Sequence, residues 1–202
     1  MKNKVVVQDY SLSFDGKNNV LEGISFDVSD GEFISLVGPS GCGKTTLLNL
    51  LAGIAPLIGS GSIKINERDP EIGSRDVAYM LARDSLFPWR TALGNAEFGM
   101  EARGETKEFF RAKALNMLAE VGLKDFSNSY PKELSHGMRQ RVALARTFAL
   151  DAQLLLMDEP FGALDAQTKL QLEDLLLRLC HQFKHTVVFV THDLALQRPP
   201  YA

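Results

Sequence analysis

Residues 38–46 read GPSGCGKTT, and their types and spacing suit them to hold phosphate groups. The segment matches the pattern G-x-x-x-x-G-K-[ST], with an apolar run at 33–37 before it and a helix-forming stretch after it. Its glycines let the backbone turn N–H groups toward phosphate oxygens. Lys44 offers a positive charge for the β- and γ-phosphates, and Thr45 offers a hydroxyl for Mg²⁺. A glycine-rich turn without a ligand is the alternative, and the spacing disfavours it. We therefore predict a nucleoside triphosphate site formed by Gly38, Pro39, Ser40, Gly41, Cys42, Gly43, Lys44, Thr45 and Thr46.

Three later segments narrow the class of nucleotide-binding protein. Residues 134–141 read LSHGMRQR, residues 153–159 read QLLLMDE, and residues 189–193 read FVTHD. A Leu-Ser-x-Gly segment, a strand ending in Asp-Glu and a strand ending in Thr-His, in this order behind a phosphate loop, resemble the ATP-binding-cassette (ABC) ATPases. The resemblance runs from the first strands to His192, which is nearly the whole chain. It implies ATP and Mg²⁺ as cofactors.

The resemblance assigns the catalytic chemistry to three residues. Asp158 would hold Mg²⁺ through water, at the ion that the Thr45 hydroxyl of the phosphate loop also serves, and Glu159 would act as general base on the attacking water. His192 would hydrogen-bond the γ-phosphate and link it to the catalytic carboxylate. Alone, an Asp-Glu pair after a strand is more often a solvated turn, and such a histidine an ordinary loop residue. Their combination with the phosphate loop favours the catalytic interpretation.

In the ABC ATPases that this chain resembles, the segment that corresponds to 134–141 is a signature that acts between subunits. Ser135 is the expected N-cap of a helix from about residue 136 to 150, whose N-terminus attracts phosphate. Ser135 and Gly137 would contact ATP held by a second subunit, and Asp165 matches a loop that crosses the interface. This implies a head-to-tail homodimer around two nucleotides. A capped surface helix with a basic face is the simpler alternative.

One aromatic residue occupies the position that usually stacks on adenine in this family. Phe14 is the residue that matches, and Tyr10 lies four positions earlier and is easily confused with it. The alternative is that Phe14 is a core aromatic.

Length and composition indicate a globular chain of one domain. It has 202 residues, of which 45% are hydrophobic and 23% charged, with a net charge of −3. Such a charge balance gives no indication of a basic surface that would bind nucleic acid. The N-terminus has too short an apolar run for a signal peptide, and no apolar run approaches the roughly 18 residues of a membrane span. The two cysteines form no disulfide framework or metal spacing. We expect a soluble cytoplasmic domain.

Alternating strand and helix patterns predict an α/β fold of the P-loop NTPase type, with a mostly parallel central sheet. Segments 4–14 and 20–28 alternate apolar and polar residues and predict an antiparallel β edge. The nucleotide-binding core is expected from 1–83 and 151–202. Residues 84–150 have helical periodicity and would form an inserted helical subdomain, so that 1–202 is a single ABC ATPase domain.

Three features depart from the family pattern. His136 replaces the first of two glycines in the signature, and Ala82 stands where a glutamine usually touches Mg²⁺ and water. Alanine has no acceptor atom for either. The chain is also C-terminally short, ending soon after His192. We therefore expect strand 186–191 to open and exchange its amide hydrogens faster than strand 33–37.

The segment LFPWRTALGNAEFGM resembles an importer branch that takes up nitrate, sulfonates, taurine or similar anions. The exposed Phe87-Pro88-Trp89 cluster would receive a cytoplasmic helix of an integral membrane permease, with local packing as its alternative. The expected partners are that permease, a second copy of this chain and, indirectly, a substrate-binding protein, at the inner face of the membrane. Two rival functions are a soluble ABC protein of DNA repair or translation and a weakened cassette that binds ATP without supporting transport.

Overall fold

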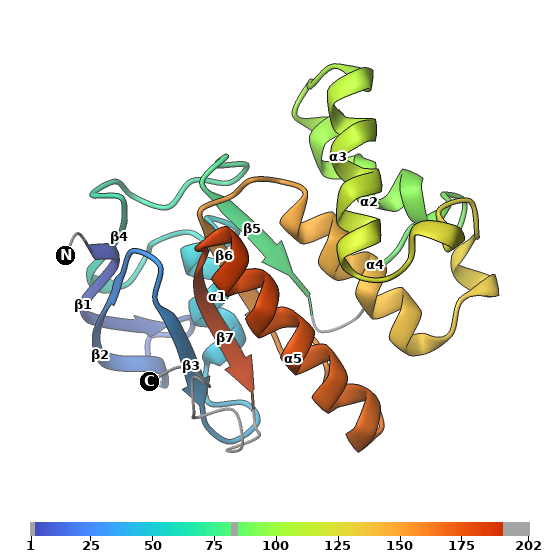
Figure 1. The fold of residues 1–202 in the computed structure, drawn as a ribbon. Coiled ribbons are helices and arrows are strands. Elements are labelled where there is room, and N and C mark those ends of the chain that lie inside the picture. The colour runs from blue at the N-terminus through green and yellow to red at the C-terminus, as the bar shows by residue number, and fades with distance from the viewer. Residues whose placement is uncertain (1–2, 82–84, 192–202) are drawn as a thin grey trace. The chain divides into compact units, whose positions relative to one another are not determined.

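A computed structural model describes residues 3–81 and 85–191 of this chain. The chain divides into two compact units (Figure 1). The first contains residues 1–79, 153–159 and 183–202, and the second contains residues 80–152 and 160–182.

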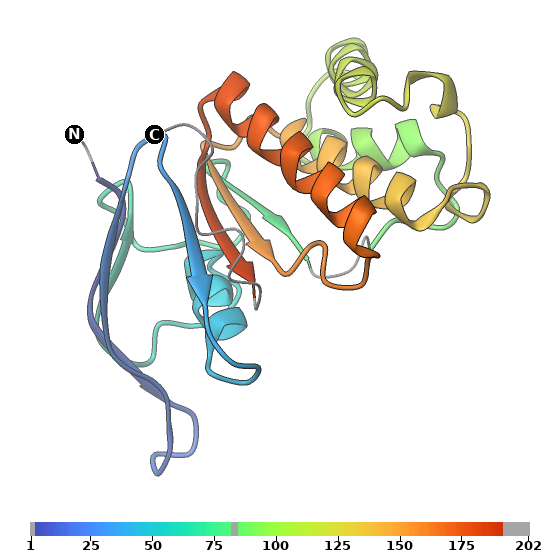
Figure 2. The same ribbon diagram turned by 60° about the horizontal axis from the view of Figure 1, so that its bottom comes forward.

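An antiparallel sheet in the first unit contains β1 (Asn3–Ser13), β2 (Asn19–Ser29) and β4 (Ser60–Ile65), in the order β2-β1-β4. Figure 2 shows the long β1 and β2 strands running side by side. Val5 and Val7 of β1 are buried because alternate residues of a strand point to the same face. The pattern of apolar and polar residues therefore selects which face of this sheet meets the core.

A parallel sheet in the same unit carries the phosphate loop. Its strands are β3 (Phe33–Val37), β5 (Val77–Met80), β6 (Leu154–Asp158) and β7 (Thr186–Thr191), in the order β3-β7-β6-β5. Helix α1 (Lys44–Leu51) follows β3 through the loop. One hydrophobic core joins α1, the antiparallel sheet and the alternate residues Leu154 and Leu156 of β6. The sheet face that packs on α1 is thus defined by residue alternation.

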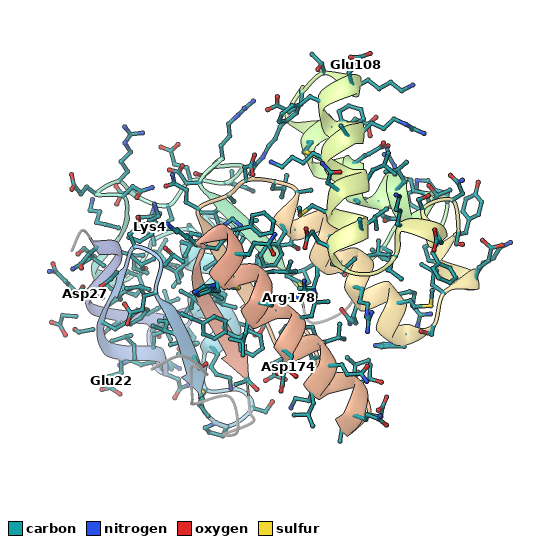
Figure 3. The ribbon with its side chains drawn as sticks, in the orientation of Figure 1. Lys4, Glu22, Asp27, Glu108, Asp174 and Arg178 are labelled. Carbon is teal, nitrogen blue, oxygen red and sulfur yellow. The ribbon has the colours of Figure 1, made fainter. Side chains whose placement is uncertain are left out.

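The second unit is helical. Its helices are α2 (Ala92–Ala102), α3 (Lys107–Glu120), α4 (His136–Phe148) and α5 (Ala166–Phe183), with short 3₁₀ turns at Lys124–Phe126 and Pro131–Glu133. Arg178 of α5 donates to the carbonyl of Glu120 at 3.1 Å and pairs with its carboxylate at 3.7 Å (Figure 3). Among the described residues, no helix has the length and apolar character needed to cross a membrane.

The predicted fold class is confirmed, including the parallel sheet, the antiparallel edge and the helical insertion. The expected strand 33–37 coincides with β3, and the helix expected from 136 ends two residues early, at Phe148. The division at 84–150 stays a prediction. The structure groups residues 160–182 with the helical unit as well, whereas the sequence interpretation placed them in the core.

The sheet topology favours the opposite order of strand opening from the one the sequence predicts. Strand β7 lies between β3 and β6, and all its residues are buried. Strand β3 lies at the edge of the four-stranded sheet, and its residues are only half-buried. A central strand is hydrogen-bonded on both sides, so its amides are released only by larger openings.

We therefore predict that amide hydrogens of 187–190 exchange more slowly than those of 33–37. The measurement is hydrogen exchange followed by mass spectrometry, without nucleotide. Faster exchange in 187–190 would show that β7 is not a stable central strand.

Candidate functional site

The phosphate loop is built by a strand, a glycine-rich turn and a helix. Gly43 is the N-cap residue of α1 with φ of 92°, in the left-handed region that favours glycine. A side chain there would place its Cβ 2.6 Å from the carbonyl oxygen of Val20. Gly41, two residues earlier, also has a left-handed backbone, with φ of 81°. Backbone geometry therefore favours glycine at both positions, and at Gly43 the close approach of β2 also excludes a side chain.

The Lys44 side chain folds back against the loop that precedes α1. Its ammonium donates to the carbonyl oxygens of Gly38 at 2.7 Å and Pro39 at 2.8 Å, and approaches the Cys42 sulfur at 3.7 Å. A negatively charged phosphate oxygen that replaced these neutral acceptors would make a stronger hydrogen bond, because both partners would then be ionised. The loop thus holds the lysine close to the place where phosphate is expected.

A cavity of about 180 Å³ opens over this loop. Its lining contains six predicted nucleotide contacts, the predicted base Glu159, and Val20, which the sequence analysis treated only as an apolar residue of a strand. The lining residues are Val20, Ser40, Gly41, Gly43, Lys44, Thr45, Thr46 and Glu159. The structure therefore brings the loop and the predicted general base together around one space.

Thr45 and Asp158, the predicted metal ligands, touch each other. The Thr45 hydroxyl donates to Oδ2 of Asp158 at 2.9 Å. A hydroxyl and a carboxylate are hard oxygen ligands of the kind Mg²⁺ prefers, and Mg²⁺ at phosphates needs only one or two protein ligands besides water. This pair fits that requirement, although the residues described here contain no cluster of three or more acidic, histidine or cysteine side chains.

Asp158 is a buried residue, with 8% of its area exposed. Burial raises its pKa, and the neighbouring charge of Glu159 raises it further. The hydrogen bond from Thr45 and the charge of Lys44 act in the opposite direction without cancelling this shift. A divalent cation would reverse the balance, because it favours the ionised carboxylate.

Glu159 begins the turn that follows β6. Its backbone adopts φ of 43°, which is unusual for a residue with a side chain, while its N–H donates to the carbonyl of Val190 at 3.0 Å. Such conformations gather at functional sites, where the surrounding structure enforces them. The hydrogen bond to β7 anchors the backbone and leaves the Glu159 side chain on the loop cavity.

The signature residues line a separate cavity of about 510 Å³ in the helical unit. The Ser135 side chain accepts from the Met138 N–H and caps α4. At Gly137 a Cβ would lie 2.8 Å from the Thr168 methyl group, so a small residue is needed there. Asp165 accepts from the Thr168 N–H at 2.9 Å, and this hydrogen bond lowers the pKa of its carboxyl group. Ser135, Gly137 and Asp165, predicted to act together, therefore share one surface.

The two aromatic candidates for stacking on adenine differ in burial. Tyr10 is 1% exposed, and its hydroxyl accepts from the Gly59 N–H at 3.2 Å, which makes it a core residue. Phe14 is 63% exposed, so the core alternative does not hold for it. Phe14 is not among the residues that line the loop cavity. Its contact with adenine stays a prediction.

Two other sequence expectations fall where the structure gives no description. His192 and Ala82 lie outside the described residues.

Trp89 lies on the surface of the helical unit with 71% of its area exposed. Phe87 supports it at a ring distance of 5.4 Å and packs edge-on against Phe98 at 4.5 Å. Asn95 fixes the turn, because its side chain accepts from the Phe87 N–H and donates to the carbonyls of Phe87 and Arg90. The aromatic cluster is thus locally packed through Phe87 and leaves Trp89 open to a partner.

Comparison with known proteins now identifies the family. The model of the ABC transporter family matches residues 21–162. The chain belongs to the ABC transporter family. It is 47% identical over 183 residues to an uncharacterised ABC transporter ATP-binding protein, YtlC of Bacillus subtilis, covering 91% of this chain and 70% of that protein. It is 41% identical over 176 residues to the taurine import ATP-binding protein TauB of Rhizobium johnstonii, covering 87% and 67% of the two chains.

A solved structure supports the fold. CbiO1 from Clostridium perfringens, described as part of the ABC transporter complex cbiONQ, superposes with a TM-score of 0.85 at 22% identity, covering 96% of this chain and 80% of that chain. Membership of the family makes this ABC protein an ATP-binding ATPase subunit of a transporter. The phosphate loop lies within the matched residues.

The raised pKa of Asp158 yields a stability prediction. A carboxyl group whose pKa is higher in the folded chain than the ordinary 3.8 stabilises folding only while protonated, so its ionised form opposes folding at neutral pH. We expect Asp158→Asn, which keeps an acceptor for Thr45, to raise the melting temperature at pH 7 by roughly 2–4 °C, about 1 kcal/mol for a chain of this size. The gain should shrink as the pH falls through the raised pKa.

The matched control is Asp174→Asn, which makes the same change at an exposed position of α5 (Figure 3). It should leave the melting temperature nearly unchanged. A fall in melting temperature for Asp158→Asn, measured without nucleotide or metal, would show that ionised Asp158 stabilises the fold.

Proposed function

We propose that this ABC protein hydrolyses ATP with Mg²⁺ and that closure of a homodimer around two nucleotides drives a membrane permease. The observation that carries the proposal is the single cavity lined by Lys44, Thr45 and Glu159, with Thr45 hydrogen-bonded to Asp158. It combines phosphate binding, metal ligands and a general base at the ends of two strands of one sheet.

Each residue then has a role that follows from its chemistry. The backbone N–H groups of the loop and the N-terminus of α1 bind phosphate oxygens, and Lys44 supplies positive charge. Thr45 and Asp158 would hold Mg²⁺, which when bound would supply positive charge to the phosphates. Glu159 accepts a proton from the attacking water. His192 and Phe14 keep the roles that the sequence predicts, at the γ-phosphate and the adenine respectively.

The homodimer is proposed because the signature cavity and the loop cavity share no lining residue. Ser135 and Gly137 place the N-terminus of α4 at the signature cavity, where its free N–H groups can bind phosphate. ATP held by the loop of a second subunit would supply that phosphate, and Asp165 would lie at the crossing between subunits. Each nucleotide site would then need residues of both copies.

The transport role is proposed as import of a small anion such as nitrate, a sulfonate or taurine. The similarity to TauB and the LFPWR segment support this class of solute. Trp89 would dock a cytoplasmic helix of the permease, placing the protein at the inner face of the cell membrane, with a substrate-binding protein as an indirect partner. Ala82 in place of the family's glutamine favours a second candidate, a weakened cassette that binds ATP without supporting transport.

The dimer is tested with a variant that binds ATP but hydrolyses it slowly. Glu159→Gln should lower kcat by about 10²- to 10⁴-fold, because the general base is removed. This variant should accumulate as a dimer on size exclusion with ATP and Mg²⁺. Adding Ser135→Asp should keep it monomeric, because aspartate preserves the helix cap but repels the phosphate of the other subunit.

The control adds Asn128→Asp to Glu159→Gln, which introduces the same charge at an exposed position of the helical unit outside the signature cavity. This protein should dimerise like Glu159→Gln alone. Dimers of equal stability with Ser135→Asp and with the control would refute the role of the signature.

A further inference from the structure

A tyrosine lies on the same sheet face as the proposed metal ligand. Tyr79 belongs to β5, the neighbour of β6 in the sheet. Its side chain packs against the core that also contains Leu154 and Leu156 of β6. Alternate residues of a strand share a face, so the next residue of β6 on the face of Leu154 and Leu156 is Asp158. Tyr79 and Asp158 therefore come from adjacent strands and face the same side, toward α1.

The hydroxyl of Tyr79 is buried and unsatisfied. Within the part of the chain that the structure describes, this oxygen has no hydrogen-bond partner. Buried polar groups are normally paired, so an exception in a native chain needs an explanation. A phenylalanine would fill the same apolar space without a polar atom to satisfy.

Burial keeps the Tyr79 hydroxyl protonated. Burial raises the pKa of Tyr79 far above its ordinary value, and the negative charge of Asp158 raises it further. The hydroxyl is thus a protonated donor at neutral pH, on the strand next to the one that carries the Asp158 carboxylate. In the structure, Thr45 donates to Oδ2 of that carboxylate. A second donor would fix the orientation of the group.

We propose that Tyr79 is a positioning residue, whose hydroxyl donates to the Asp158 carboxylate and orients it when Mg²⁺ and ATP bind. The inference rests on the proposed function, in which Asp158 holds Mg²⁺. Thr45 already donates to one oxygen of this carboxylate, and a second donor from the neighbouring strand would fix the orientation in which the group meets the ion. Tyr79 acts through Asp158 and has no role in binding the nucleotide itself.

The test measures Mg²⁺ dependence of binding rather than turnover. Calorimetry of the full chain follows binding of a non-hydrolysable ATP analogue, first in EDTA and then at increasing free Mg²⁺. Tyr79→Phe should leave the affinity in EDTA unchanged. The Mg²⁺ concentration at which half of the affinity gain is reached should rise roughly tenfold, as expected for one lost hydrogen bond to a charged group. The melting temperature of this variant without ligand should rise, because an unpaired buried hydroxyl is removed.

Tyr10→Phe is the matched control, since it removes a buried hydroxyl that does have a partner in the same unit, the Gly59 N–H. It should lower the melting temperature and leave the Mg²⁺ midpoint unchanged. The inference is overturned if Tyr79→Phe leaves the midpoint unchanged, or if it lowers affinity equally in EDTA and in Mg²⁺. The second pattern would mark a merely structural role.

Asp158→Asn separates this inference from the proposed function. It should abolish the gain in affinity that Mg²⁺ provides. If it does and Tyr79→Phe changes nothing, only the role of Tyr79 fails. If Asp158→Asn retains the full gain, the assignment of the metal ligand fails and the inference fails with it.

Discussion

The hydrogen bond from Thr45 to Asp158 joins two segments that lie 113 positions apart, and the geometry of the site depends on it. It connects the first turn of α1 to the last residue of β6. The connection is possible because β3 and β6 are parallel to β7 between them, so that their carboxyl ends reach the same edge of the sheet. The sheet topology therefore brings together the phosphate loop, which follows β3, and the acidic pair Asp158 and Glu159 at the end of β6.

Several features that oppose folding gather at this end of β6. Asp158 carries a buried carboxylate with a raised pKa, Glu159 holds a left-handed backbone, and Tyr79 has a buried hydroxyl that finds no partner among the residues the structure describes. The compensating stability comes from elsewhere in the unit, where α1, both sheets and the alternate residues of β6 and β7 share one apolar core. Unpaired or strained groups in an otherwise consistent fold are typical of a binding site, because a bound ligand supplies the interactions that these groups lack.

The sequence predicts local features of this fold well and non-local ones less well. The phosphate loop, β3 and the Ser135 cap follow from spacing and residue type, since each depends on neighbours in the chain. The central place of β7 does not, because strand order is a property of the whole sheet. Tyr10 and Phe14 are similar in sequence terms, and only burial distinguishes them. Val20 reaches the loop cavity through the approach of β2, which leaves no trace in the pattern of that strand.

In the proposed mechanism the chemistry is divided between two compact units, and this division bears on how hydrolysis can produce movement. The loop cavity uses residues of the first unit, and the signature cavity uses residues of the helical unit. A nucleotide buried entirely within one rigid unit would change little outside it when hydrolysed. If one phosphate instead interacts with both surfaces, its loss removes an interaction that only the ATP-bound arrangement makes, and this difference shifts the equilibrium between arrangements. The proposed permease contact at Trp89 belongs to the same helical unit as the signature, so a change sensed by Ser135 can be transmitted within a single packed body.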